Sequence, residues 1–499
     1  MPGETMDSFY VTTPIYYVNG LPHIGHSYTT IAADVLSRHK RKLGWDVFFL
    51  TGTDEHGQKV VRAAQEKNMT PQEFVDGIIP RFREAWKKLE ISYDDFIRTT
   101  EPRHIRAVQN FLQELQDKGE LSLGEYEGLY CVPCEVFWTD KQAESGLCPD
   151  CRRPVERIKE TNYFFKLSRH QEWLISHIAK HPDFIQPESR RNEVLAFLKE
   201  NTLTDLCISR PKTRLSWGIP LPFSPAHVTY VWFDALINYI AALGYPGEKE
   251  RFEKFWPSSL HLIGKDILRQ HAVIWPIMLH AVGMEPPKRI YAHGWWQVGQ
   301  EKMSKSRGNV VDPLALIDEF GIDIYRYFLL RDVPFGLDGV FSRASLIQRF
   351  NGDLANDLGN LVFRTLTMAE KYFDGRVPAL QKERLKSPLA SEILLKLDKL
   401  PALVDAGLER LDFIAALEGI WSVIGNCNKY VEETKPWNLK KEGRQEDLED
   451  FLAVLITAIR CVAGELEPFM PQTAQKILSQ IKDDHVVKGD PLFPRIEEE

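Results

Sequence analysis

The sequence lacks the features that mark membrane and secreted proteins. No apolar run comes near the roughly 18 residues that a membrane-spanning helix needs, which excludes a bilayer-spanning chain. The first residues, MPGETMDSFYV, have neither the basic start nor the long apolar stretch of a secretory signal, so we expect a cytoplasmic protein without disulfides. A net charge of -8 rules out a generally basic chain, but a nucleic-acid partner stays open because an acidic protein can carry a local basic face.

The chain is long enough for two or more domains, and its pattern changes along its length. Residues 9–57 alternate apolar strand, amphipathic helix and apolar strand, which predicts a βαβ unit with parallel strands, and residues 258–298 resume this pattern. Residues 115–224 carry short strand-like pieces and a cysteine cluster, as expected of an insertion between two halves of a sheet. Beyond Ser342 apolar residues recur at helical spacing, which predicts an all-helical bundle, as in Phe413, Leu417, Trp421 and Ile424.

Two histidines stand one turn apart where the first helix is expected to begin. The segment TTPIYYVNGLPHIGH places His23 and His26 after a strand and a turn, with Gly25 between them. The first N–H groups of a helix attract anions, so imidazole N–H donors here would stabilise phosphate charge, and Gly25 would admit close approach of the ligand. Two ordinary polar histidines at a helix start are the structural alternative. A metal pair is disfavoured because no third ligand is adjacent.

A second segment supports the phosphate interpretation. KMSKS, residues 302–306, places Lys302 and Lys305 three apart among small polar residues and is followed by Arg307 and Gly308. This arrangement suits a mobile phosphate-binding loop in which each ammonium acts as a point charge. Taken alone it would more often be a solvated surface loop, but its presence in one chain with PHIGH favours a nucleotide site.

Four of the seven cysteines form two knuckles. Cys131, Cys134, Cys148 and Cys151 have the spacing C-x2-C-x13-C-x2-C, which suits four thiolates around one zinc ion. Disulfides are the alternative, and a reducing compartment disfavours them. Because no open ligand position is implied, one structural Zn²⁺ per chain is expected to pin a small domain with little core. The other cysteines are expected to be buried apolar residues: Cys207, Cys427 and Cys461.

PHIGH and KMSKS are together the signatures of class I aminoacyl-tRNA synthetases, which the chain resembles from end to end. Within this class it resembles the methionyl-tRNA synthetase family, whose pattern is matched by TTPIYYVNG, FLTGTDEHG, YVWFDALINY, LIGKDILRQHAVIWPIM and AHGWWQVGQEKMSKSRGN. The resemblance implies ATP-dependent ligation of L-methionine to tRNA(Met) through a methionyl-adenylate, with release of AMP and pyrophosphate. It also implies Mg²⁺ accompanying ATP, and a monomer is the expected state.

The resemblance further implies a Rossmann-like parallel-sheet catalytic domain, an inserted zinc-knuckle connective domain and an all-α helical-bundle anticodon-binding domain. The catalytic halves would occupy residues 1–114 and 225–297, with the insertion at 115–224. Residues 298–345 would hold the KMSKS loop and a stem-contact region, and residues 346–499 the anticodon-binding domain.

The site residues implied by the resemblance fall into groups by ligand. For methionine, Asp54 would pair with the α-ammonium, and a pocket suited to a polarizable thioether would consist of Ile15, Tyr17, Trp232, Ala235, Leu236, Tyr239, Ile267, His271 and Trp275. ATP would be bound by His23, Gly25, His26, Gly264, Asp266, His293, Gly294, Lys302 and Lys305. Catalysis would rest on His23, His26, Lys302 and Lys305. The anticodon would be read by Asn360, Arg364 and a stacking Trp437. Taken singly, the aromatics suit core packing, Asp266 a helix cap and Trp437 a packed helix end.

Three other functions stay open. A sibling synthetase for isoleucine, valine, leucine or cysteine is one, although the enzymes for branched aliphatics usually carry a larger editing insertion than this chain can hold. A catalytically silent RNA-binding protein would need an inactive nucleotide site, which the two intact motifs oppose. A small-molecule nucleotidyltransferase would leave the helical domain without a role. Pyrophosphate exchange into ATP, tested with all twenty amino acids, separates these functions.

Overall fold

Six parallel strands form the main sheet of the first of two compact units, Met1–His293 and Gly294–Glu499. The computed structural model describes residues 7–18, 22–132, 136–138, 140, 142–143, 145–149, 151–298, 301–302, 312–482 and 484–496. The strand order is β3-β2-β1-β12-β13-β7, and every neighbouring pair is parallel. The predicted α/β class is confirmed. The strands are β1 (Ser8–Tyr17), β2 (Asp46–Asp54), β3 (Asp95–Arg98), β7 (Ile185–Gln186), β12 (Ser259–Gly264) and β13 (Arg289–His293).

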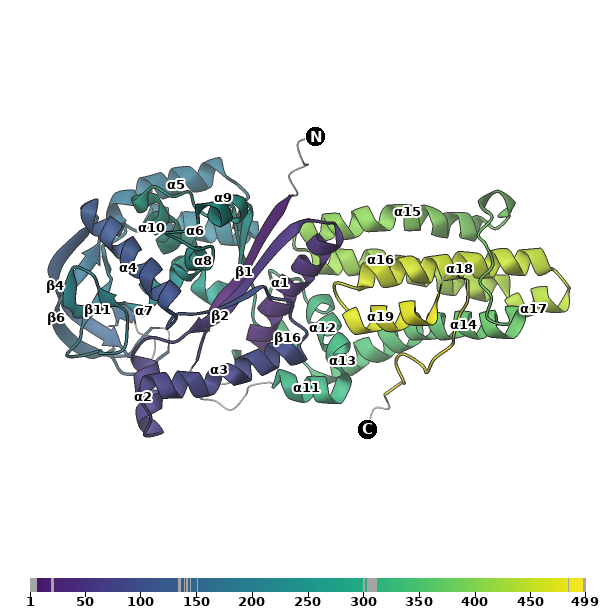
Figure 1. Cartoon of the computed structure of the whole chain (residues 1–499), viewed down its shortest axis with the longest axis horizontal. Helices are drawn as coiled ribbons and strands as arrows, with labels where there is room; N and C mark the ends of the chain where they lie inside the picture. Colours follow the sequence, from purple (N-terminus) through teal and green to yellow (C-terminus); the bar gives the residue numbers. More distant parts are fainter. Residues whose placement is uncertain are drawn as a thin grey trace. The chain divides into compact units, whose positions relative to one another are not determined.

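Helices connect these strands as the βαβ pattern predicts. In Figure 1, α1 runs beside β1 and β2, which it joins. β2 is buried along all but its first residue, as expected of a strand covered on both faces, and its first half accordingly carries the apolar run VFFL. The helices of this part are α1 (Ile24–Lys42), α2 (Gln58–Glu66), α3 (Pro71–Lys88), α4 (Pro102–Asp117), α7 (Val231–Leu236), α8 (Asn238–Ala241), α9 (Lys249–Phe255) and α10 (Trp275–Val282).

Two smaller antiparallel sheets lie between β3 and β12 in the sequence. One has the order β5-β4-β6-β8 and the other β10-β11-β9. Their strands are β4 (Leu121–Cys131), β5 (Val136–Trp138), β6 (Glu156–Phe165), β8 (Leu206–Cys207), β9 (Ser209–Pro211), β10 (Pro220–Leu221) and β11 (Ser224–Thr229), accompanied by α5 (Gln171–Lys180) and α6 (Glu188–Glu200). The short strand β7 also falls within residues 115–224, yet it pairs with β13, so this range contributes one strand to the main sheet.

The second unit is mostly helical. A small sheet precedes the bundle and consists of β14 (Trp296–Val298), β15 (Glu301–Lys302) and β16 (Gly339–Phe341). Within the described residues, no further strand of this kind follows β16. The predicted helical domain is therefore confirmed, and the helices α14, α15, α16 and α18 are drawn alongside one another in Figure 1. The helices are α11 (Pro313–Phe320), α12 (Ile322–Arg331), α13 (Arg343–Arg349), α14 (Asn360–Phe373), α15 (Pro388–Glu409), α16 (Phe413–Thr434), α17 (Pro436–Lys441), α18 (Gln445–Leu466) and α19 (Pro471–Gln480).

Packing in the bundle follows the apolar spacing of the sequence. Phe413, Leu417 and Ile424 are buried on α16, whereas Trp421 is only half-buried. The buried guanidinium of Arg326 on α12 donates to the main-chain carbonyls of Phe469 and Pro468, both at 2.9 Å, and so ties α12 to the turn before α19. Among the described helices, none combines the length and the apolar character needed to cross a bilayer.

Candidate active site

The carboxyl ends of four neighbouring strands bring many of the predicted site residues to one edge of the main sheet. β1 lies between β2 and β12, so the chain leaves β1 toward one side of the sheet and later returns on the other. α/β proteins bind ligands at this kind of switch point. The residues at or just beyond these strand ends are Ile15 and Tyr17 on β1, Asp54 on β2, Gly264 on β12, Asp266 and Ile267 after β12, and His293 on β13.

The two histidines of the PHIGH segment cap α1. His23 is the N-cap residue, and its Nδ1 accepts a hydrogen bond from the main-chain N–H of Gly25 at 3.1 Å. In return, Nδ1 of His26 accepts from the main-chain N–H of His23 at 3.3 Å. The two rings stack with centroids 3.8 Å apart, and a Cβ added at Gly25 would lie 3.0 Å from Cε1 of His23. Their spacing of three residues is therefore the spacing of a capping box.

This capping fixes the tautomer of both rings. A main-chain N–H can only donate, so Nδ1 of each histidine must act as an acceptor and cannot carry a proton. Each imidazole is then neutral with its proton on Nε2, which makes Nε2 a hydrogen-bond donor at a helix N-terminus. The structural alternative and the phosphate interpretation are thus compatible, because different nitrogens serve the two roles.

The residues expected near adenosine lie close together. His293 is buried, and its Nε2 lies 2.6 Å from Oγ1 of Thr29, which joins the end of β13 to α1. A Cβ built on Gly264 would lie 2.6 Å from Oδ1 of Asp266 and 3.9 Å from Cε1 of His293. A side chain at position 264 would therefore displace the Asp266 carboxylate. Gly294 belongs to the second unit, where a Cβ would meet the carbonyl oxygen of Leu337 at 2.0 Å.

The predicted methionine-pocket residues divide into a buried and a partly exposed set. Tyr239 on α8 and Trp275 at the start of α10 are buried, with ring centroids 6.0 Å apart, and Ala235 and Leu236 of α7 are buried with them. The other hydrophobic members are half-buried and pack against the same core, which leaves them surface to offer a ligand: Ile15, Tyr17, Trp232 and Ile267. In the β1–β2 register Tyr17 is the direct partner of Asp54, so these two candidates are immediate neighbours.

His271 joins the two parts of this pocket as a neutral group. It lies in a π-helical stretch, Gln270–Ile274, and its Nδ1–H donates to the carbonyl of Ile267 at 2.9 Å. Burial lowers the pKa of His271 to about 4, so Nε2 accepts the hydrogen bond from the Tyr239 hydroxyl at 2.8 Å. The pair holds the phenol ring in one orientation.

Sequence reasoning missed His261, in the middle of β12. It is fully buried, and its ring stacks on that of Tyr239 at 4.1 Å. Nε2 accepts from the indole N–H of Trp275 at 3.3 Å, which leaves Nδ1 to donate to the Thr12 hydroxyl at 2.8 Å. Burial holds the pKa of His261 well below its usual value. The available signal was a histidine inside the apolar run SLHLIG, a position that needs buried polar partners.

The cysteine cluster has the geometry of a metal site. The sulfur atoms of Cys131, Cys148 and Cys151 lie within 4.8 Å of one another, with Cys131 and Cys151 3.5 Å apart and no disulfide among them. Tetrahedral zinc thiolates at about 2.3 Å would place sulfurs about 3.8 Å apart, so these three fit. Cys134 lies outside the described residues. Among the described residues of this segment, a small apolar cluster packs together: Tyr130, Val132 and Ile158.

The remaining cysteines differ in burial. Cys207 and Cys427 are buried, as predicted, whereas Cys461 is half-buried. In the motif KMSKS, Lys302 is the last residue of β15, while residues 303–306, and with them Lys305, lie outside the described residues.

The three anticodon candidates lie on two helices of the second unit. Asn360 and Arg364 are one turn apart on α14, and Trp437 on α17 is 40% exposed. Nη1 of Arg364 pairs with Oε1 of Glu432, near the end of α16, at 2.7 Å. Because Glu432 is largely exposed, this pair is a weak one that a base edge could replace.

Known proteins match the whole chain. A family model described as "tRNA synthetases class I (M)" matches residues 9–158 and 153–366, and one described as "Anticodon-binding domain of tRNA ligase" matches residues 390–499. The methionine–tRNA ligase of Clostridium perfringens is 50% identical over 98% of this chain and 78% of that protein. Its counterpart in Caldanaerobacter subterraneus subsp. tengcongensis is 49% identical over 99% of this chain and 79% of that protein. The chain belongs to the methionyl-tRNA synthetase family.

Solved members of the family share the architecture described above. The Mycobacterium tuberculosis methionyl-tRNA synthetase in complex with methionyl-adenylate superposes with a TM-score of 0.93 at 40% identity, covering 98% of this chain and all of that one. The apo form of the same synthetase gives a TM-score of 0.86 at 38% identity over 99% of both chains. The resemblance seen in the sequence is confirmed.

Proposed function

We propose that the chain ligates L-methionine to tRNA(Met) in two steps. The methionine carboxylate attacks the α-phosphorus of ATP and expels pyrophosphate, and a terminal ribose hydroxyl of the tRNA then takes the methionyl group and releases AMP. The observation that supports the proposal is that candidates from the three groups lie at or just beyond the carboxyl ends of neighbouring parallel strands or at the start of α1: Tyr17, Asp54, His23, His26, Gly264, Asp266 and His293. Membership of the methionyl-tRNA synthetase family supports the choice of amino acid.

Methionine is held at both ends in this proposal. The carboxylate of Asp54, at the end of β2, pairs with the α-ammonium, and the half-buried faces of Tyr17 and Trp232 receive the thioether. Tyr239 is held in a fixed orientation, because its phenol donates to His271, which burial keeps neutral. An unbranched, polarizable side chain suits such an aromatic site better than a branched aliphatic one does.

ATP lies along the start of α1, with Gly264 and Asp266 at the ribose and His293 and Gly294 near adenine. The Nε2–H groups of His23 and His26 donate to the phosphates, and their capping bonds hold both rings in place as the charge develops. Lys302 and Lys305 add positive charge to the phosphates. Mg²⁺ bound with ATP would neutralise part of the triphosphate charge.

The tRNA and the metal engage other parts of the chain. Trp437 stacks an anticodon base while Asn360 and Arg364 read base edges. Cys131, Cys148 and Cys151, with Cys134, would hold one structural Zn²⁺, which would fold the knuckle around the small apolar cluster beside it. A monomer acting in the cytoplasm is the state we propose.

The test is pyrophosphate exchange into ATP, measured with each of the twenty amino acids, followed by charging of tRNA(Met) transcripts. Exchange that depends on methionine, together with charging of tRNA(Met), is the expected result. Equal exchange with isoleucine, valine or leucine would point to a sibling synthetase. Absence of exchange with every amino acid would refute the catalytic assignment.

A further inference from the structure

Three consecutive residues lie at and just beyond the end of β2, next to the proposed methionine site. Asp54 is the proposed partner of the α-ammonium, and Glu55 and His56 follow it directly. Nδ1 of His56 lies 3.1 Å from Oδ2 of Asp234, on the pocket helix α7, and the main-chain carbonyl of His56 accepts the Tyr17 hydroxyl at 2.7 Å. The position of this tripeptide therefore decides where the ammonium partner stands relative to both walls of the pocket.

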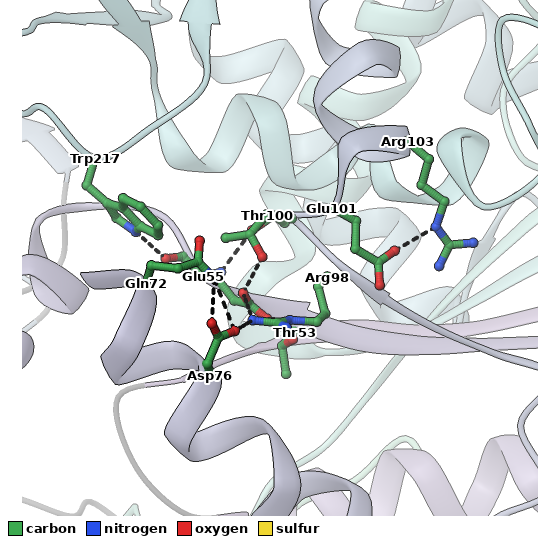
Figure 2. A network of polar contacts seen from close by, with 10 residues as sticks. Thr53, Glu55, Gln72, Asp76, Arg98, Thr100, Glu101, Arg103 and Trp217 are labelled. Carbon is green, nitrogen blue, oxygen red and sulfur yellow. Dashed lines mark hydrogen bonds and ion pairs between the residues drawn. The ribbon is translucent and has the colours of Figure 1, made fainter. Parts of the chain in front are cut away.

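Glu55 is bound by the protein through all of its polar groups. Its carboxylate accepts from Nε and Nη2 of Arg98 at 2.7 and 2.9 Å, from Thr53 Oγ1 at 2.7 Å and from Thr100 Oγ1 at 2.6 Å (Figure 2). Its main-chain N–H donates to Thr99 Oγ1 at 2.9 Å, and its carbonyl accepts the indole N–H of Trp217 at 2.6 Å. The side chain is fully buried, so Glu55 cannot contact the substrate itself.

The network of hydrogen bonds around Glu55 continues beyond Arg98. Arg98 ends β3, where it is the register partner of Thr53, and its Nη2 also donates to Asp76 at 2.5 Å. The amide of Gln72 donates to the Asp76 carboxylate in turn, at 3.0 Å. The hydrogen bonds that the guanidinium donates to Glu55 and Asp76 raise the pKa of Arg98 against the effect of its burial, so Arg98 stays charged. A planar fork with both carboxylates leaves little freedom to the main chain at position 55.

The alternation of an extended chain puts the side chains of Glu55 and Asp54 on opposite sides of this segment. Residues i and i+2 of an extended segment share a face, and the hydrogen bond between Thr53 and Glu55 shows that these two do. Asp54, between them, points the other way. A buried ion pair costs desolvation and adds little net stability compared with apolar packing. Its value at this position lies in the fixed location that it gives the neighbouring residue.

We propose that Glu55 is a positioning residue for methionine, which holds the Asp54 carboxylate at the place where it receives the α-ammonium. This inference rests on the proposed function, since it assumes the role given there to Asp54. It adds a residue that the resemblance did not single out. It also predicts a specific defect, confined to ligands that carry the ammonium group.

The experiment compares three ligands with the full chain: L-methionine, L-methioninol, which keeps the ammonium but lacks the carboxylate, and 4-(methylthio)butanoate, which lacks the ammonium. Dissociation constants are measured by titration of tryptophan fluorescence or by competition, for the parent chain and for Glu55→Gln. We expect the affinities for methionine and methioninol to fall about tenfold or more, and that for the ligand without the ammonium to change less than about twofold. The KM for ATP in pyrophosphate exchange should stay within about twofold.

Matched variants make the result interpretable. Glu101→Gln removes a carboxylate that pairs with Arg103 at 2.7 Å, away from Glu55 in Figure 2, and should leave all three affinities unchanged. Thr100→Val removes one of the four side-chain hydrogen bonds to Glu55 and should give a smaller loss with the same selectivity, which provides a test if Glu55→Gln fails to fold. Equal weakening of all three ligands, or no change in any, would overturn the proposal.

A further variant separates this inference from the function on which it rests. Asp54→Asn should weaken the affinity for the two ligands that carry an ammonium group and leave the affinity for 4-(methylthio)butanoate nearly unchanged. If it does and Glu55→Gln does not, the positioning role fails while the role of Asp54 stands. If Asp54→Asn shows no such selectivity, the ammonium site lies elsewhere and both assignments fall.

Discussion

Replacing His26 can separate the two roles that the structure gives to one side chain. Nδ1 of His26 caps the main-chain N–H of His23, and its Nε2–H is the proposed donor to the phosphates of ATP. Glutamate at the third helical position is the usual partner in a capping box, so His26→Glu keeps an acceptor for the His23 N–H but removes the donor. His26→Ala removes both.

The two variants should therefore differ in stability and agree in activity. Loss of a capping side chain costs about 1 kcal/mol, which in a unit of this size lowers the melting temperature by about 2 to 4 °C in His26→Ala, while His26→Glu should melt close to the parent. Loss of a donor to developing charge costs about 10² to 10³ in rate, so methionine-dependent pyrophosphate exchange should fall by at least that factor in both.

Thermal unfolding and exchange kinetics at saturating methionine provide the assay. If His26→Glu matched the parent chain in both stability and exchange, the reasoning would be refuted. A carboxylate cannot donate a hydrogen bond to phosphate, so the side chain at position 26 would then not act as a phosphate donor. His26→Ala with parental stability would show instead that the capping bond contributes nothing measurable.

Three further predictions follow from other parts of the chain. Burial lowers the pKa of His271 to about 4, so between pH 6.5 and 4 the unfolded chain binds more protons than the folded one. The free energy of unfolding, measured with denaturant, should therefore fall as the pH falls through this window. In His271→Gln it should depend less steeply on pH. Trp437→Ala, at a 40% exposed position, should raise the KM for tRNA(Met) about tenfold and leave pyrophosphate exchange unchanged, whereas loss of exchange would indicate a folding defect. Cys148→Ser should lower the zinc content, measured by atomic absorption, below one per chain and speed proteolysis within residues 121–165; undiminished zinc would exclude this cysteine as a ligand.

The parallel sheet was predictable where its signal is local. The apolar runs at β1 and β2, with an amphipathic helix between them, gave the βαβ unit, and the run at β12 gave its return. The two-residue strand β7 carries no such signal, because Ile185 and Gln186 are too few for a periodicity. Its place beside β13 depends on a pairing across about a hundred residues, which only the folded chain reveals.

The site was predictable as a set of residues, but not as a network. Resemblance supplied Tyr239 and His271, yet nothing in the sequence showed that one donates to the other. His261 was missed because its partners Thr12 and Trp275 come from different segments, the first of them 249 residues away. Glu55 was likewise hidden inside FLTGTDEHG, where a run of three polar residues gives no sign of which one faces the ligand.

The neutral state of the histidines decides where the positive charge for catalysis must come from. Main-chain donors occupy Nδ1 of His23 and His26, so neither ring can be an imidazolium while it caps α1. Both can donate a hydrogen bond to phosphate, but neither can neutralise it. The lysines of KMSKS then have a role that the histidines cannot fill, and Lys305→Ala should slow adenylate formation far more than it weakens methionine binding. Pre-steady-state formation of adenylate, measured beside the dissociation constant of methionine, tests this; equal losses in the two quantities would contradict it. Loss of the charge alone, in Lys305→Gln, should resemble Lys305→Ala, because the ammonium acts as a point charge rather than through its shape.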